Sequence, residues 1–306
     1  MVIMNKNIDG MLVSKVLYKE LNDYLLKKDI IPNVVDICIG NDFGCLMYSK
    51  CKKKRISKET CINFKCVYFE DISYLELKRY IEELNNDDEV TGIMLQLPLP
   101  KHLEKYERDI LDTIDYNKDI DGLTTMSIGK LSSNGDSLVP CTALGIESLL
   151  KVYDVWLEGK LVAIVNRSNI VGKALMYLML RNNASFVMCH SKTKNLSLIT
   201  RQCDIVIVGV NKSEYITSEY VKDGAVVVDV GVHSNGRGDV DYYDVYDKVS
   251  LITPSVGGVG PMTVCMLAYN AAKVVYGDEV NDVLERGILK AKIVSKQRTV
   301  RLQQAV

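Results

Sequence analysis

The sequence is poor in the features that build metal sites, and it has no excess of charge of either sign. Its three histidines lack metal-ligand spacing and no two of its nine cysteines form a C-x-x-C pair, so we expect no metal site. The 38 basic and 39 acidic side chains nearly cancel, which argues against a nucleic-acid or membrane-surface partner. No stretch approaches the ~18 apolar residues of a membrane span, and no secretory leader is evident.

The cysteines indicate a reducing compartment. Their number is odd, and several lie in apolar runs such as the one around Cys38, which disfavours a disulfide framework. We therefore expect a soluble cytoplasmic protein. A cluster of basic residues near the end of the chain is predicted to be a solvated or frayed tail: Lys290, Lys292, Lys296, Arg298 and Arg301.

Strand and helix patterns alternate along the chain. At 306 residues it exceeds the size of one growing hydrophobic core, so two domains are expected. The predicted strands are 33–39, 62–70, 91–96, 161–166, 185–190, 204–210 and 225–232. The predicted helices are 8–28, 44–59, 75–86, 101–112, 261–277 and 280–294. This alternation predicts two α/β domains with parallel sheets.

The domain boundaries follow from these elements. Residues 1–139 would form the first domain and 140–264 the second, with the junction near 139–142. The helices at about 265–294 would return to the first domain, and 295–306 would be the basic tail.

A nucleotide site is predicted where the 161–166 strand runs into a turn and a helix. Such a helix start offers N–H groups and a positive dipole to phosphate. Only Gly172 matches the glycine-rich fingerprint, however, and a plain structural βα unit explains the pattern about as well. The next strand ends in Ser191 and Lys192 where a ribose-binding carboxylate is usual. Together with Arg167, these residues favour a 2′-phosphate and therefore NADP.

Candidate chemistry in the first half lies on a helix and two loops. Tyr48 and Lys52 are spaced i, i+4 and share a helix face, although such pairs are usually surface decoration. Gln96 precedes the rigid Pro98 and Pro100, and Asp121 lies before a glycine in a loop. An aromatic ring, an ammonium, an amide and a carboxylate suit a flat heteroaromatic substrate that also needs proton transfer.

A glycine-rich loop stands late in the chain. Residues 257–263 hold three glycines and a proline, which disfavours a strand or helix interior. A connection without a ligand is the default interpretation of this loop taken alone. Its backbone can nevertheless approach a flat ligand closely, and Pro261 would stand near the start of a helix.

Taken together, these segments resemble the bifunctional methylenetetrahydrofolate dehydrogenase/methenyltetrahydrofolate cyclohydrolase family over roughly residues 3–285. The matching motifs are Tyr48-x-x-x-Lys52, Gln96-Leu97-Pro98-Leu99-Pro100, Lys118-Asp119-Ile120-Asp121-Gly122, Pro140-Cys141-Thr142, Arg167-Ser168-x-x-Val171-Gly172, Cys189-His190-Ser191, Asp229-Val230-Gly231 and residues 257–263. The resemblance implies a folate-binding catalytic domain, a Rossmann-type NADP-binding domain and a homodimer made through the nucleotide domains. It also implies oxidation of 5,10-methylenetetrahydrofolate followed by hydrolysis to 10-formyltetrahydrofolate.

The same resemblance implies roles for individual residues. The implied catalytic residues are Lys52, which would handle protons, Gln96, Asp121 and Tyr48. The implied substrate-binding residues are Tyr48, Gln96, Leu97, Asp121, Gly257, Gly258, Gly260 and Pro261. The implied NADP-binding residues are Thr142, Asn166, Arg167, Ser168, Ser191, Lys192 and Val232.

Several positions depart from the family pattern, mostly around the nucleotide site: Cys45, Ala143, Asn166, Ala174, Asn211, Ser213 and Val256. The side chain of Asn166 is expected to obstruct the turn, so glycine there should tighten cofactor binding. These departures leave open a cyclohydrolase with weakened dehydrogenase activity. A folate-binding protein without turnover is the third possibility, although Lys52, Gln96 and Asp121 count against it.

Overall fold

The computed structural model describes residues 6–133, 135 and 137–304, which form two compact units. The first unit contains Tyr18–Cys141 and Val264–Arg286, and the second contains the described parts of Met1–Leu17, Thr142–Thr263 and Gly287–Val306. The boundary after Cys141 lies inside the junction expected from sequence. The first residues group with the second unit because Ile8 N–H donates to Ile252 O at 2.8 Å, extending its sheet.

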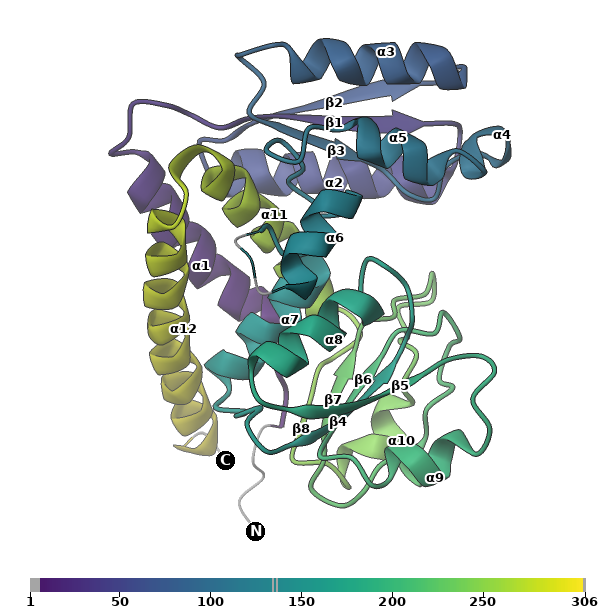
Figure 1. The fold of residues 1–306 in the computed structure, drawn as a ribbon. Coiled ribbons are helices and arrows are strands. Elements are labelled where there is room, and N and C mark those ends of the chain that lie inside the picture. The colour runs from purple at the N-terminus through teal and green to yellow at the C-terminus, as the bar shows by residue number, and fades with distance from the viewer. Residues whose placement is uncertain (1–5, 134, 136, 305–306) are drawn as a thin grey trace. The chain divides into compact units, whose positions relative to one another are not determined.

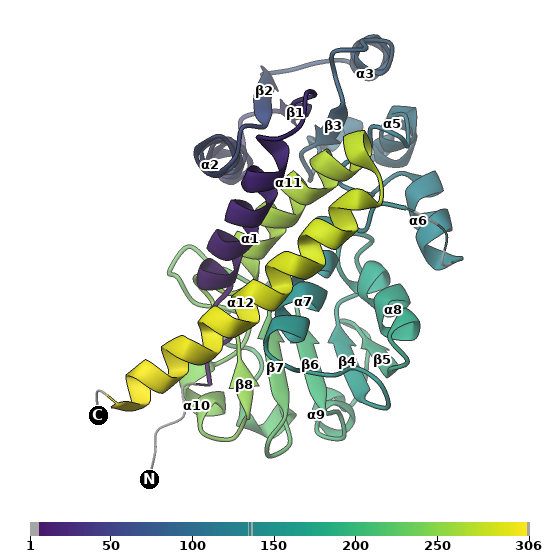
Figure 2. The same cartoon turned by 90° about the vertical axis from the view of Figure 1, so that its left-hand side faces the viewer.

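The first unit is built on a three-stranded parallel sheet in the order β2-β1-β3. Helices α2 and α3 lie on opposite faces of this sheet (Figures 1 and 2), and Ser73 and Glu76 cap α3 reciprocally. The predicted 101–112 helix is divided into α4 and α5. The elements are β1 (Asn33–Ile39), α2 (Phe43–Glu59), β2 (Asn63–Phe69), α3 (Tyr74–Asn85), β3 (Gly92–Leu95), α4 (Lys101–Glu104), α5 (Glu107–Thr113) and α6 (Thr125–Ser132).

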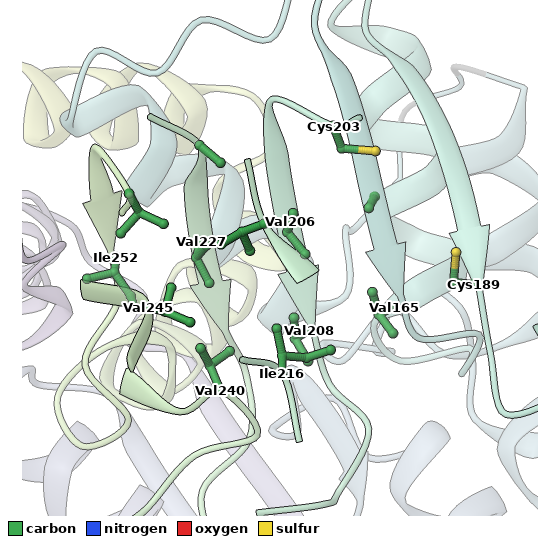
Figure 3. Packing of buried hydrophobic residues seen from close by; sticks show 14 residues of the cluster. Val165, Cys189, Cys203, Val206, Val208, Ile216, Val227, Val240, Val245 and Ile252 are labelled. Atoms are coloured by element: carbon green, nitrogen blue, oxygen red, sulfur yellow. The ribbon is translucent and has the colours of Figure 1, made fainter. Parts of the chain in front are cut away.

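The second unit is built on a five-stranded parallel sheet in the order β5-β4-β6-β7-β8. Its short valine-rich strands pack a continuous core, whose side chains Figure 3 shows spread across the neighbouring strands. The elements are β4 (Leu161–Val165), α8 (Gly172–Arg181), β5 (Ser185–Cys189), α9 (Leu196–Thr200), β6 (Ile205–Val208), η1 (Ser218–Tyr220), β7 (Val226–Asp229), α10 (Tyr242–Tyr246) and β8 (Leu251–Ile252). The sequence did not predict the short β8.

Four helices contribute residues to both units: α1 (Gly10–Leu25), α7 (Cys141–Val152), α11 (Val259–Tyr276) and α12 (Glu279–Gln304). Within the first unit, α1 and α11 meet through the rings of Tyr24 and Tyr276, whose centroids are 5.6 Å apart. Arg286 of α12 pairs with Glu20 of α1 at 3.3 Å. The expected return of the C-terminal helices to the first domain is therefore confirmed.

The basic residues near the C-terminus belong to helix α12 and not to a frayed tail, while the side chains of Lys296 and Arg298 are 65% and 52% exposed, as expected of a solvated segment. Helix α12 continues to Gln304. Asp154 forms ion pairs with Lys292 and Lys296, and the Lys296 Nζ lies 2.8 Å from its carboxylate. Arg298 forms an ion pair with Asp9. Carboxylates of the second unit thus pair with α12 as far as Arg298. Across the described residues, none of the helices combines the length and apolar character that a bilayer crossing needs.

Candidate functional site

The first-unit site begins on α2, which Asp42 caps by accepting from Cys45 N–H at 2.7 Å. Lys52 on this helix is only 5% exposed. Its Nζ lies 4.6 Å from the centre of the Tyr48 ring, over the ring face. A buried ammonium needs compensating partners, and an aromatic face supplies part of that compensation. The i, i+4 pair predicted from sequence is therefore a real contact around a buried charge.

The loop after α5 carries two aspartates with different surroundings. Asp119 is buried, and its carboxylate accepts from Thr124 N–H at 2.8 Å and Ser127 Oγ at 2.7 Å. It therefore shapes the loop. Asp121 is half-buried; loss of solvent raises its pKa, while the nearby Lys52 ammonium opposes that rise. Asp121 therefore lies within the electrostatic influence of Lys52.

Gln96 follows β3 and makes a contact that sequence analysis missed. Its Nε2 donates to Asp36 Oδ1 at 2.6 Å, and Ser49 Oγ donates to Asp36 Oδ2 at 2.6 Å. Asp36 lies within β1 and is fully buried. The signal was available, because a carboxylate interrupts an otherwise apolar buried strand. Gln96 and the face of α2 that carries Lys52 are therefore linked through one carboxylate.

The segment after Gln96 forms a rigid edge. The Leu97-Pro98 peptide bond is cis, and Gly40 has a φ of +86° that disfavours any side chain; a Cβ there would also lie 3.1 Å from the Pro100 ring. Cys45 Sγ lies 3.9 Å from Leu97 O, and burial raises the pKa of its thiol to about 11. A neutral thiol therefore lies beside this edge, and the role of Leu97 in substrate binding remains a prediction.

The second unit has a pocket where its strand order reverses. The chain moves from β4 to β5 on one side and then to β6 on the other, and ligands of parallel α/β sheets bind at the carboxyl ends of such strands. A cavity of about 410 Å³ lies there. Its lining residues are Val165, Asn166, Arg167, Ser168, His190, Ser191, Thr193, Leu196, Gly209, Val210, Lys212 and Tyr215.

The pocket includes some predicted residues and omits others. Arg167, Ser168, Asn166 and Ser191 line it, whereas Lys192, Val232 and Thr142 are not among its lining residues. Sequence analysis missed Thr193, Lys212 and Tyr215 as pocket residues. Thr193 was detectable, because it lies two residues after Ser191. Its hydroxyl accepts from His190 N–H at 2.9 Å and so shapes the turn.

Two buried aspartates organise the loop after β6. Asp239 accepts from the backbone N–H groups of residues 210–212 at 2.6 to 3.0 Å. His233 Nε2 lies 2.9 Å from the same carboxylate. Asp229 accepts from Asp239 N–H at 3.1 Å, and burial raises its pKa to about 6. These carboxylates therefore hold the pocket wall that carries Lys212.

The side chain of Asn166 is part of the turn rather than an obstruction to it. Its Oδ1 accepts from Ser168 N–H at 2.8 Å and Gly172 N–H at 3.0 Å, and its Nδ2 donates to Gly209 O at 2.5 Å. The Gly172 N–H at the start of α8 is thus already satisfied within the protein. Arg167 and the hydroxyl groups of the pocket must therefore provide more of any phosphate binding than the helix start provides.

This geometry reverses the sequence-based expectation for Asn166→Gly. The substitution removes hydrogen bonds worth about 0.5–1.5 kcal/mol each and frees the backbone. We expect a lower melting temperature and a dissociation constant for the dinucleotide that rises several-fold. Thermal melts and calorimetric titration of the variant measure both quantities, and tighter binding at an unchanged melting temperature would contradict this account.

Gly172 cannot carry a side chain in this turn. A Cβ there would lie 2.3 Å from the Asn166 carbonyl oxygen and 2.9 Å from Arg167 N, both backbone atoms. We expect Gly172→Ala to displace the turn and weaken dinucleotide binding at least tenfold. Gly129→Ala is the matched control, because nothing lies within 4 Å of a Cβ at that helical position. Equal binding by the two variants would refute the close approach at Gly172.

The glycine-rich loop belongs to the second unit. Gly257 has φ +91°, and a Cβ on Gly258 would lie 2.3 Å from Pro254 O. Helix α11 begins at Val259, so Gly260 and Pro261 stand in its first turn, as expected from the position of the proline. The conformation therefore demands both glycines, and the binding of folate by this loop remains a prediction.

The fold and the two candidate sites together define the class of protein to which this chain belongs. The second unit is a doubly wound parallel domain with a nucleotide-sized pocket at its strand-order reversal. The first unit is a separate α/β unit with a buried lysine and carboxylates. Residues 8–121 match the tetrahydrofolate dehydrogenase/cyclohydrolase catalytic domain, and residues 140–278 match the NAD(P)-binding domain of that family. The chain therefore belongs to the tetrahydrofolate dehydrogenase/cyclohydrolase family.

Individual relatives agree with this assignment. The bifunctional protein FolD of Agathobacter rectalis is 42% identical over 273 residues, covering 87% of this chain and 97% of its own. The structure of the bifunctional FolD enzyme of Campylobacter jejuni is 40% identical, with a TM-score of 0.83 over 88% of this chain and 98% of its own. The Trypanosoma brucei enzyme, solved with NADP and an inhibitor, is 30% identical, with a TM-score of 0.82 over 88% and 97%.

Proposed function

We propose that this chain oxidises 5,10-methylenetetrahydrofolate to the 5,10-methenyl cation with NADP and hydrolyses that cation to 10-formyltetrahydrofolate. The observation that carries the proposal is the set of contacts around Lys52 in a chain of this family. The buried ammonium of Lys52 lies over the Tyr48 ring and opposes the rise in the pKa of Asp121. Its helix, α2, is linked to Gln96 through hydrogen bonds to Asp36.

These residues suit the hydrolytic step. Water must first add to the one-carbon bridge of the cation and lose a proton. One carbon–nitrogen bond then breaks, and the ring nitrogen that is released takes up a proton. We assign this proton transfer to Lys52, with Gln96 as its hydrogen-bonding partner. Tyr48 offers a ring face to the pterin. Asp121 offers a carboxylate that accepts from the amino-pyrimidine.

The second-unit pocket fits NADP. Arg167 and Lys212 bring cations, Ser191 and Thr193 bring hydroxyls, and no carboxylate appears among the described residues that line the cavity. A guanidinium and hydroxyls are the donors that a 2′-phosphate prefers, whereas a ribose hydroxyl is usually met by an acid. When bound, NADP supplies the hydride acceptor. The protein's part is to hold substrate and nicotinamide at reacting distance.

A homodimer in the cytoplasm is also part of this proposal. β5 is an edge strand of the five-stranded sheet, and its Phe186, Val187 and Met188 are only half-buried. An edge strand with apolar side chains is a natural surface for pairing with a second copy. Light scattering after size-exclusion chromatography should give twice the 34.3 kDa mass, and a monomer at micromolar concentration would reject the dimer.

The test of function is a pair of assays on one preparation. We expect oxidation of methylenetetrahydrofolate with NADP to exceed that with NAD, and purified methenyltetrahydrofolate to be hydrolysed faster than in buffer. Hydrolysis without oxidation would identify a cyclohydrolase with a weakened dehydrogenase, which the hydrogen bonding of Gly172 N–H to Asn166 makes the leading alternative. Folate binding without either activity would reject the proposal.

A further inference from the structure

We propose that Asp36 is a positioning residue of the hydrolytic step, which fixes the side-chain amide of Gln96 in one orientation. This inference rests on the role proposed above for Gln96. It concerns a residue of β1 that does not itself touch the substrate.

The sheet register brings the two residues together. Asp36 pairs with Met94 of β3 on one side and with Cys66 of β2 on the other. Gln96 lies two residues after Met94, so its side chain leaves the same face of the sheet. Ser49 of α2 covers this face and reaches the other carboxylate oxygen. Asp36 is therefore enclosed by β2, β3 and α2.

The chemistry of the two groups determines how the amide must point. Asp36 is 0% exposed, and a buried carboxylate is costly unless hydrogen bonds satisfy it. A carboxylate accepts hydrogen bonds and cannot donate them, so Gln96 has to present its NH₂ group to Asp36. The carbonyl oxygen of Gln96 is thereby turned away from Asp36.

The orientation of this carbonyl matters for catalysis. Lys52 is an ammonium donor, and an attacking water is also a donor, so either group needs an acceptor at this place. An amide without this anchor can rotate by 180°, so that its NH₂ group takes the position of its oxygen. A hydrogen-bond donor would then point at the ammonium, which is itself a donor. Asp36 removes that alternative.

The test compares three variants for hydrolysis of methenyltetrahydrofolate. Asp36→Val removes the anchor and should lower kcat on the order of 10- to 100-fold, with KM and dehydrogenase rate changed less than about threefold. Asp36→Asn keeps an oxygen that can accept from Gln96 Nε2 and should retain kcat within about threefold. Ser49→Ala is the matched control, because it removes the short hydrogen bond from Ser49 Oγ to Asp36 Oδ2 and leaves Gln96 anchored on Oδ1. A normal kcat in Asp36→Val, or an equal loss in Ser49→Ala, would overturn the proposal.

A double-mutant cycle separates this inference from the proposed function. If Asp36 acts through Gln96, Asp36→Val should cause no further loss of kcat in a Gln96→Ala background. The same fold-loss in both backgrounds would overturn the inference while leaving the role of Gln96 intact. Full hydrolytic activity of Gln96→Ala alone would instead reject the proposed role of Gln96.

A measurement on the unaltered protein keeps the inference testable if Asp36→Val fails to fold. The side-chain amide signals of Gln96, assigned by their loss in Gln96→Ala, should show a downfield-shifted proton and slow solvent exchange in ¹H–¹⁵N spectra. The downfield shift should decrease in Asp36→Asn, where a neutral oxygen replaces the carboxylate. Fast exchange at solvent-exposed chemical shifts in the wild type would contradict the anchored amide.

Discussion

Replacing Lys52 by methionine is expected to lower kcat for hydrolysis of methenyltetrahydrofolate by about 10²–10⁴-fold, the usual contribution of a positioned acid or base. Methionine keeps an unbranched apolar side chain of similar length in this buried position. Oxidation of methylenetetrahydrofolate should fall less, because hydride transfer needs the reactants held in register but no proton from lysine. Both rates are measured on one purified sample of the variant.

Lys53→Met provides the control, since Lys53 is the exposed neighbour of Lys52 on the same helix. It should leave both activities unchanged. Near-normal hydrolysis by Lys52→Met, with an unchanged melting profile, would remove Lys52 from the mechanism. The stacked Tyr48 and Lys52 pair would then be a structural contact only.

Replacing Arg167 by alanine should raise KM for NADP by about 10- to 150-fold and leave KM for NAD unchanged. The guanidinium lines the pocket, and a charge-assisted hydrogen bond to the 2′-phosphate contributes about 1.5–3 kcal/mol. Lys192→Ala is the matched control, because Lys192 follows the same strand but is not among the pocket-lining residues. Equal losses with both cofactors would show that Arg167 does not recognise the 2′-phosphate.

Sequence periodicity was sufficient to predict the features that depend on residues close together in the chain. Strand 33–39 has the bounds of β1, and the spacing of Tyr48 and Lys52 places them in contact because both lie on one helix. Parallel strands joined by helices were likewise predicted, whereas the order of the strands within each sheet was not. Together with the family motifs, these features predicted both α/β units and four of the twelve residues that line the second-unit pocket, namely Asn166, Arg167, Ser168 and Ser191.

Contacts between distant segments could not be predicted in the same way. Asp36 and Gln96 are 60 positions apart, and their hydrogen bond depends on the register of β1 against β3. The addition of residues 6–8 to the sheet at β8 is equally non-local. At Asn166 the sequence showed a side chain where glycine was expected, but only the folded structure reveals that its amide accepts hydrogen bonds from the backbone of the turn. In each case, a local sequence pattern does not identify the hydrogen-bonding partner.

The most direct test of the account follows the two reactions in one time course that begins with methylenetetrahydrofolate and NADP. We expect the wild type to form NADPH and 10-formyltetrahydrofolate, whereas Lys52→Met forms NADPH and accumulates the methenyl cation. The contradictory result is a Lys52→Met time course that proceeds to 10-formyltetrahydrofolate at the wild-type rate.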